Sequence, residues 1–167
     1  MFSCQNHKNQ EKVPIPTNKG TNNDTVFYYW KPDYSVYSFD TVVNETGLEM
    51  KTFCLNDSSI YVAISSKNHN EPIQVKVAHN FKTILLIKTR TKELKFSLGK
   101  ENFRSSLPKD FYKICYMWKN EFSHIENDQF IFQAVFAEPD TDYQYSIVYS
   151  INENGEMVIL KVEDDSY

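Results

Sequence analysis

The chain has 167 residues, a formal net charge of −4 and 41% hydrophobic residues, which suits a single globular domain. The acidic balance argues against a global basic field for nucleic acid, and no apolar run reaches the roughly 20 residues that span a membrane. Aromatic residues make up 15% of the chain, whereas only 4 glycines are present.

The two ends of the chain differ from its middle in composition. Residues 1–25 are polar, contain Pro14 and Pro16 and show no periodicity, which predicts a flexible N-terminal arm. Residues 26–162 form the expected single domain, and residues 163–167 are expected to be a short acidic tail. The first residues are polar rather than a hydrophobic leader, so we expect an intracellular protein, cytoplasmic or nuclear, or a secreted one if Met1 replaces a removed leader.

In the middle of the chain, apolar residues recur at every second position in short runs about ten residues apart, which is typical of strands that bury one face. Turn-forming residues separate the runs, among them Asn56-Asp57-Ser58 and Asn152-Glu153-Asn154-Gly155. Residues 100–110 leave room for at most a short helical turn, which Pro108 ends. We therefore predict an all-β fold, an antiparallel β-sandwich of the galectin-like or lectin-like jelly-roll kind, with roughly 10–12 short strands and little helix. The expected strands cover residues 26–30, 37–43, 48–54, 60–64, 73–77, 82–88, 94–98, 110–119, 130–136, 143–151 and 158–162.

The stretch DYQYSIVYSI, residues 142–151, is the clearest of these runs. Tyr143, Tyr145 and Tyr149 share one row with Ile147 and Ile151. Such a row fits the inward face of a sandwich, and it also fits a platform that docks a ligand or a partner. We favour the inward face because the neighbouring strands alternate in the same way. The three hydroxyl groups would then end at a sheet edge or in a partner.

No pattern in the chain supports catalysis or cofactor binding. No two glycines lie close together, so the chain has neither a dinucleotide-binding turn nor a phosphate loop. The histidines are isolated, and we interpret His69 and His79 as surface turn residues that flank one strand. We therefore predict no metal site, no cofactor, no catalytic residues and a protein that is not an enzyme.

Three cysteines, Cys4, Cys54 and Cys115, leave two interpretations open. Reduced thiols on strands behave as small hydrophobic residues. A secreted protein, in contrast, could join Cys54 to Cys115 in a disulfide. We favour reduced thiols because a secreted disulfide scaffold usually carries more cysteines, and because Cys115 stands in a dense apolar run.

One segment in the middle of the chain gathers basic and aromatic residues. A basic face with aromatic rings can bind single-stranded nucleic acid, but alternating lysines also protect the free edge of a sheet. We favour the protected edge and expect no nucleic-acid partner. The residues concerned are Phe81, Lys82, Lys88, Arg90, Lys92, Lys95 and Phe96.

Several runs follow one another as they do in a known family. The order of YSVY (34–37), LEMKTF (48–53), ND (56–57), IYVAIS (60–65), PIQVKV (72–77), DF (110–111), Trp118 and Asn120 resembles the farnesoic acid O-methyltransferase-like domain over about residues 34–136. The chain departs from that family at Ala78-His79-Asn80, where a Gly-Gly-Trp-x-Asn segment is usual, and at Glu121, where a glycine is usual. The resemblance implies a β-sandwich of galectin-like shape. It does not imply methyl transfer, since the chain has no cofactor pattern for that reaction.

Two kinds of function fit such a domain. We favour a non-enzymatic protein–protein interaction or scaffolding module that binds another protein, or itself as a homodimer, because aromatic residues are enriched at interfaces. The alternative is a module for a small ligand, either a carbohydrate or a hydrophobic, terpenoid-like compound. A divergent enzyme without a recognisable motif remains as a third hypothesis, and no membrane partner is expected. The expected contact residues are Tyr28, Trp30, Trp118, Tyr143, Tyr145 and Tyr149.

Overall fold

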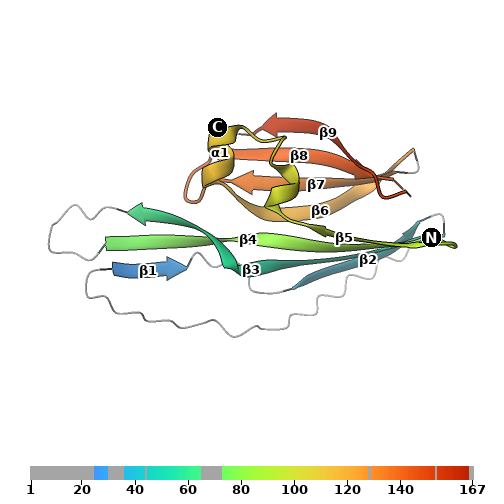
Figure 1. The fold of residues 1–167 in the computed structure, drawn as a ribbon, viewed down its shortest axis with the longest axis horizontal. Coiled ribbons are helices and arrows are strands. Elements are labelled where there is room, and N and C mark those ends of the chain that lie inside the picture. The colour runs from blue at the N-terminus through green and yellow to red at the C-terminus, as the bar shows by residue number, and fades with distance from the viewer. Residues whose placement is uncertain are drawn as a thin grey trace.

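The computed structural model describes residues 25–29, 36–43, 45–64, 73–127, 129–152 and 154–165. These residues form two β-sheets with two short helices between them in sequence, which confirms the predicted all-β sandwich (Figure 1). Most of the predicted N-terminal arm lies outside the described residues. The elements are β1 (Thr25–Tyr29), β2 (Tyr37–Val43), β3 (Thr46–Ile64), β4 (Ile73–Lys88), β5 (Glu93–Leu98), the 3-10 helix η1 (Lys100–Phe103), α1 (Lys109–Ile114), β6 (Tyr116–Glu126), β7 (Gln129–Ala137), β8 (Gln144–Ile151) and β9 (Met157–Asp164).

The first sheet is built around the long strand β4. The strand order is β1-β4-β3-β2, and β5 also pairs with β4. β1 runs parallel to the first part of β4, from Ile73 to Val77, and β5 runs antiparallel to its last part, from Thr83 to Lys88. The two short strands therefore share one side of β4. This parallel pair departs from the predicted antiparallel arrangement.

The second sheet is a simple meander in the order β6-β7-β8-β9, and each pair is antiparallel. The turn between β8 and β9 confirms the hairpin predicted there. Asn152 Oδ1 accepts hydrogen bonds from the backbone N–H groups of Asn154 (2.9 Å) and Glu156 (3.0 Å). Gly155 has φ = +87°, a conformation that residues with a Cβ atom rarely adopt.

Two predicted pairs of strands are each one long strand, so the described residues contain nine strands. The predicted turn at Asn56-Asp57-Ser58 is wrong, because β3 runs without reversal from Thr46 to Ile64. The extra residues are absorbed by a register shift against β4 between Cys54 and Ser59. A β-bulge of this kind lets polar, turn-prone residues stay within a strand. The predicted strands 73–77 and 82–88 likewise form the continuous β4.

The strand predicted over residues 110–119 is wrong in its first half. Residues Lys109–Ile114 form α1, in which the Cys115 N–H donates to the Phe111 carbonyl at 2.9 Å. Pro108 stands at the N-cap of this helix and accepts from the Tyr112 N–H at 2.8 Å, so it begins a helix rather than ending one. The predicted short helical turn before it is present as η1.

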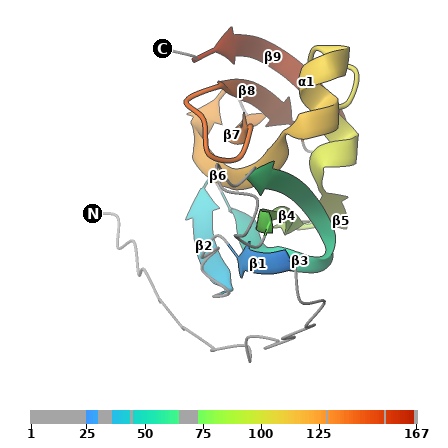
Figure 2. The same cartoon turned by 90° about the vertical axis from the view of Figure 1, so that its left-hand side faces the viewer.

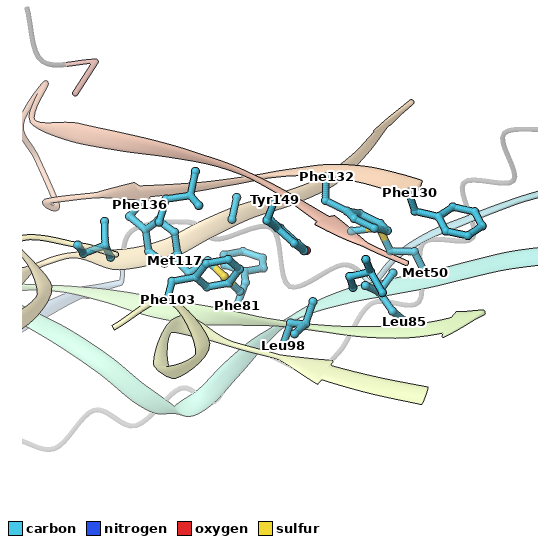
Figure 3. Close-up of a cluster of buried hydrophobic side chains, with 14 of the residues drawn as sticks. Met50, Phe81, Leu85, Leu98, Phe103, Met117, Phe130, Phe132, Phe136 and Tyr149 are labelled. Atoms are coloured by element: carbon cyan, nitrogen blue, oxygen red, sulfur yellow. The ribbon is translucent and has the colours of Figure 1, made fainter. Parts of the chain in front are cut away.

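The core lies between the sheets and beneath the two helices. Phe103 of η1 packs edge-on against Phe136 and Tyr149 of the second sheet, with ring centroids 5.3 and 5.2 Å away. Figure 3 shows Phe103 beside Phe81 of β4, while Leu85 of the same strand lies farther along the cluster, next to Met50. In Figures 1 and 2, β6 lies next to β4 and β9 lies farthest from the first sheet. β6 and β9 are thus the two edges of the second sheet, and only β6 lies near the first sheet.

Candidate interaction surface

The tyrosine row of β8 faces the interior. Tyr149 has no exposed surface, and Tyr143 and Tyr145 are half-buried against Phe111, with ring centroids 4.7 Å from it. The Tyr145 hydroxyl lies 3.5 Å from that of Tyr143 and donates to Asp164 Oδ2 at 3.0 Å. The hydrogen bond with Tyr143, together with desolvation and the Asp164 carboxylate, raises the pKa of Tyr145. The row is therefore a packing face, and two of its hydroxyls end beside β9.

A chain of buried polar groups connects Tyr149 to the opposite sheet. The Tyr149 hydroxyl donates to Asn120 Oδ1 at 2.9 Å, and Asn120 Nδ2 donates to Thr83 Oγ1 at 3.2 Å. Thr83 Oγ1 lies 3.0 Å from Thr52 Oγ1. All four side chains are buried, and burial raises the pKa of Tyr149. Buried polar groups are stable only when they are hydrogen-bonded, so this series of hydrogen bonds fixes how the two sheets face each other.

The other aromatic residues expected to contact a partner lie elsewhere. Trp118 is 40% exposed on β6, at a register shift between Met117 and Lys119. Tyr28 lies on β1, and its side chain falls outside what the structure describes; Trp30 lies outside the described residues. Trp118 and the β8 tyrosines do not form one site, because Trp118 is exposed at an edge strand while the tyrosines pack inward.

Cys54 and Cys115 are free thiols. Burial raises the pKa of each to about 11, so both are protonated near neutral pH. Lys100 Nζ donates to the Cys115 carbonyl at 2.5 Å, and desolvation lowers the pKa of that lysine. The same ammonium group lies 4.5 Å from the ring centre of Tyr112, so it fastens η1 to the end of α1.

The basic segment does not form a stacking platform. Phe81 is buried in the core. Lys88 pairs with Glu49 at 2.6 Å, and Arg90 pairs with Glu45. The cations are thus partly neutralised by acids of the β2–β3 side of the sheet, which supports the predicted role as a solvated edge.

The predicted surface position of His79 is wrong. His79 is not a surface turn residue: it lies within β4, 5% exposed, and desolvation lowers its pKa. The error arose because a turn was expected after residue 77, where β4 continues. His69 lies outside the described residues. Within the described ranges no three metal-binding side chains come together, and no helix there is long and apolar enough to cross a membrane.

The outer face of the second sheet has no charge at its centre. The cross-strand pairs of β7 and β8 on this face are Ile131–Ser150, Gln133–Val148 and Val135–Ser146. The outer face of the first sheet carries charges on four strands, at Asp40, Glu49, Lys88 and Lys95. In the second sheet, Ile131, Val135, Ser146 and Ser150 are already buried within the chain, and Lys119, Glu121, Lys161 and Glu163 place charges on the same outer side. The centre of this face is therefore not an exposed apolar surface.

Exposed apolar side chains concentrate on β9, at the free edge of this sheet. Val158 and Leu160 are each 49% exposed and Val162 is 40% exposed, whereas Met157 and Ile159 pack against the core. No described strand pairs with the second edge of β9. We call Val158, Leu160, Val162 and this free backbone edge the β9 surface.

The register of β9 explains why these side chains are exposed. Ile159 pairs with Tyr149 and Lys161 pairs with Val148, so Leu160 is an extra residue at a bulge. The bulge reverses the alternation halfway along the strand. The sequence showed only that Val158, Leu160 and Val162 are apolar and two apart. The missed signal was the unbroken apolar run MVIL before Lys161.

The fold and this surface define the chain as an all-β sandwich domain with an apolar free edge. The chain belongs to the family described as a domain of unknown function (DUF4738), whose model matches residues 3–159. The match provides no link to the farnesoic acid O-methyltransferase-like domain. A comparison with curated proteins finds no match.

Proposed function

We propose that this domain is a non-enzymatic protein-interaction module and that the β9 surface is its binding site. One observation carries the proposal: three of the seven large hydrophobic side chains exposed on the described residues belong to one eight-residue edge strand. Covering side chains that are about half exposed stabilises a complex by roughly 1 kcal/mol each. Val158 and Leu160 lie on the outer side of the sheet and Val162 on the core side, so a partner along this edge would contact apolar side chains on both sides of β9.

A free edge and apolar side chains together favour one mode of recognition. An extended segment can add to β9 as a further strand, with its backbone groups pairing along the edge and its side chains covering Val158 and Leu160. The alternative, a small-ligand module, has less support because Tyr143, Tyr145 and Tyr149, which were expected to stack on a ligand, pack in or against the core.

Site-specific photo-cross-linking in the native cell tests this function. A photoreactive amino acid replaces Val158 in one variant and Val42 in a matched variant, since Val42 is an apolar residue on edge strand β2 that is 68% exposed. We expect discrete cross-linked protein species from position 158 and not from position 42. The purified species should then bind the purified chain and bind the Leu160→Lys variant more weakly. Equal cross-linking from both positions, or no discrete species from position 158, would contradict the proposal.

A further inference from the structure

We propose that the partner of the β9 surface is a second copy of this chain, with two β9 strands pairing antiparallel to make one continuous eight-stranded sheet. This inference rests on the proposed function and names its partner. A free strand edge is a template for another strand unless charges, bulges or neighbouring elements block it.

The two edges of the second sheet differ in this respect. β6 contains two register shifts, and its Met117 N–H is occupied by Asn80 Oδ1 of β4 at 3.0 Å. Each edge carries an exposed ion pair, Lys119–Glu121 on β6 and Lys161–Glu163 on β9, so the ion pairs do not distinguish the two edges. β9 has one register shift and lies away from the first sheet. β9 is therefore the edge at which this sheet can extend.

The pairing partners of β9 within the sheet show which way its side chains point. Met157, Ile159, Val162 and Asp164 pair with residues of the inward tyrosine–isoleucine row of β8, so they lie on the core side. Val158, Lys161 and Glu163 pair with Ser150, Val148 and Ser146, so they lie on the outer side together with the bulge residue Leu160. Residues that face each other in a sheet must lie on the same side of it.

Only one two-fold register satisfies this condition along the whole of β9. With the axis between Leu160 and Lys161, Ile159 lies opposite Val162 of the second copy on the core side. Val158 then lies opposite Glu163, Leu160 opposite Lys161, and Met157 opposite Asp164, each pair on one side of the sheet. A regular strand without the bulge could not match itself in this register, because the axis would place inward residues opposite outward ones. A regular strand would match itself with the axis on any residue, whereas the bulge leaves β9 this single two-fold register along its whole length.

The charges of β9 are compatible with this register. Lys161, Glu163 and Asp164 all face apolar residues of the second copy, so no like charges lie directly opposite each other. Lys161 and Glu163 also form an ion pair at 2.5 Å within one chain, which leaves the methylene groups of Lys161 beside Leu160 of the second copy. Antiparallel pairing about Lys161 itself would instead bring two ammonium groups together.

The length of the strand sets the expected strength. Eight paired residues make a strand ladder about 26 Å long. A contact limited to one such ladder buries less surface area than the interfaces of most stable dimers. We therefore expect a dimer that forms reversibly as the concentration of the full 167-residue chain rises. Sedimentation velocity should show the mass moving from 19.7 kDa toward twice that value. Hydrogen exchange at β9 should slow over the same concentration range, while exchange at β2 stays constant.

Two substitutions at one position test the register. Leu160→Lys places an ammonium group opposite Lys161 of the second copy, and the two-fold axis repeats this repulsion. Leu160→Glu removes the same apolar side chain but places a carboxylate there. We expect the lysine variant to dimerise about tenfold more weakly than the glutamate variant, with a gap that narrows in high salt. The matched Val42→Lys variant on β2 should dimerise like the unsubstituted chain.

Three results would overturn the inference: a monomer at all concentrations, equal dimerisation by the two Leu160 variants, or weakening by Val42→Lys as strong as that by Leu160→Lys. Near-ultraviolet circular dichroism of each variant confirms that it is folded. The proposed function fails separately. A monomeric chain whose position 158 still cross-links to a different protein contradicts the dimer alone, whereas a monomeric chain without discrete cross-links contradicts both.

Discussion

Removing the hydroxyl group of Tyr149 tests whether the buried polar chain holds the two sheets in place. Tyr149 is fully buried, its ring stacks on Phe132 with centroids 5.2 Å apart, and its hydroxyl donates to Asn120 Oδ1 at 2.9 Å. Tyr149→Phe keeps the ring and its stacking. It removes one donor and leaves the buried oxygen of Asn120 without that hydrogen bond.

The expected loss follows from the burial of both partners. A buried hydrogen bond contributes about 1 kcal/mol, and a buried acceptor left without a donor costs about 1–3 kcal/mol. Since Asn120 is only 3% exposed, water cannot easily replace the lost donor. We expect Tyr149→Phe to lower the free energy of unfolding by about 1–3 kcal/mol, which corresponds to a fall in Tm of roughly 2–12 °C for a chain of this size.

Tyr145→Phe is the matched control, because it makes the same chemical change in the same row of β8. Tyr145 also donates a hydrogen bond, to Asp164 Oδ2 at 3.0 Å, but this carboxylate is exposed and can bind water instead. Its loss should change stability by less than about 0.5 kcal/mol. Urea unfolding followed by tryptophan fluorescence measures both variants. Equal losses in the two variants, or a changed urea dependence for Tyr149→Phe, would refute the reasoning.

Three further predictions concern titration, thiol access and a turn. Desolvation lowers the pKa of His79 in the folded chain. The free energy of unfolding should therefore be highest above the unfolded pKa of about 6.5 and should decrease as the pH drops below that value. His79→Gln should flatten this dependence, measured as Tm against pH. Cys115 is fully buried, and its pKa is raised to about 11. An alkylating reagent at pH 8 should therefore modify this thiol only as fast as the chain unfolds. Equal rates of labelling in the folded and the urea-unfolded chain would contradict its buried position. Gly155→Ala should cost about 1–2 kcal/mol in thermal unfolding, because φ is +87° and the new Cβ would lie 3.2 Å from Phe96 Cζ, whereas Gly47→Ala, with its nearest neighbour at 3.7 Å, should cost less than about 0.5 kcal/mol.

The sequence predicted the fold best where one face of a strand is buried and the other is solvated. Strands β5, β7 and β8 lie where the alternation placed them, because a period of two has a single structural meaning over six or more residues. It failed for Lys109–Ile114, since a helix of six residues makes fewer than two turns and leaves no measurable period. It also failed at Asn56-Asp57-Ser58, because turn-prone residues are equally compatible with a bulge.

The candidate site could be predicted only in part. Aromatic content and alternation correctly indicated that the Tyr149 side of β8 faces inward, because that depends on the strand alone. Exposure on β9 depends on two facts that the strand does not carry: its position at the end of the sheet order and the register shift opposite Val148. Both are set by long-range pairing. A pattern of apolar residues two apart therefore predicted a strand at Val158–Val162 without revealing that it is an exposed edge.

The register shift in β9 affects both faces of the stretch DYQYSIVYSI, residues 142–151. On the core side, Ile159 pairs with Tyr149 and Val162 pairs with Ile147, which keeps apolar contacts on both sides of the bulge. On the outer side, the extra residue Leu160 has no partner in β8 and extends into solvent. Without the bulge, strict alternation after Ile159 would have placed Lys161 and Glu163 on the core side. The exposure of Leu160 is thus the structural consequence of keeping the tyrosine row covered, and the proposed pairing with a second copy would cover that remaining side chain.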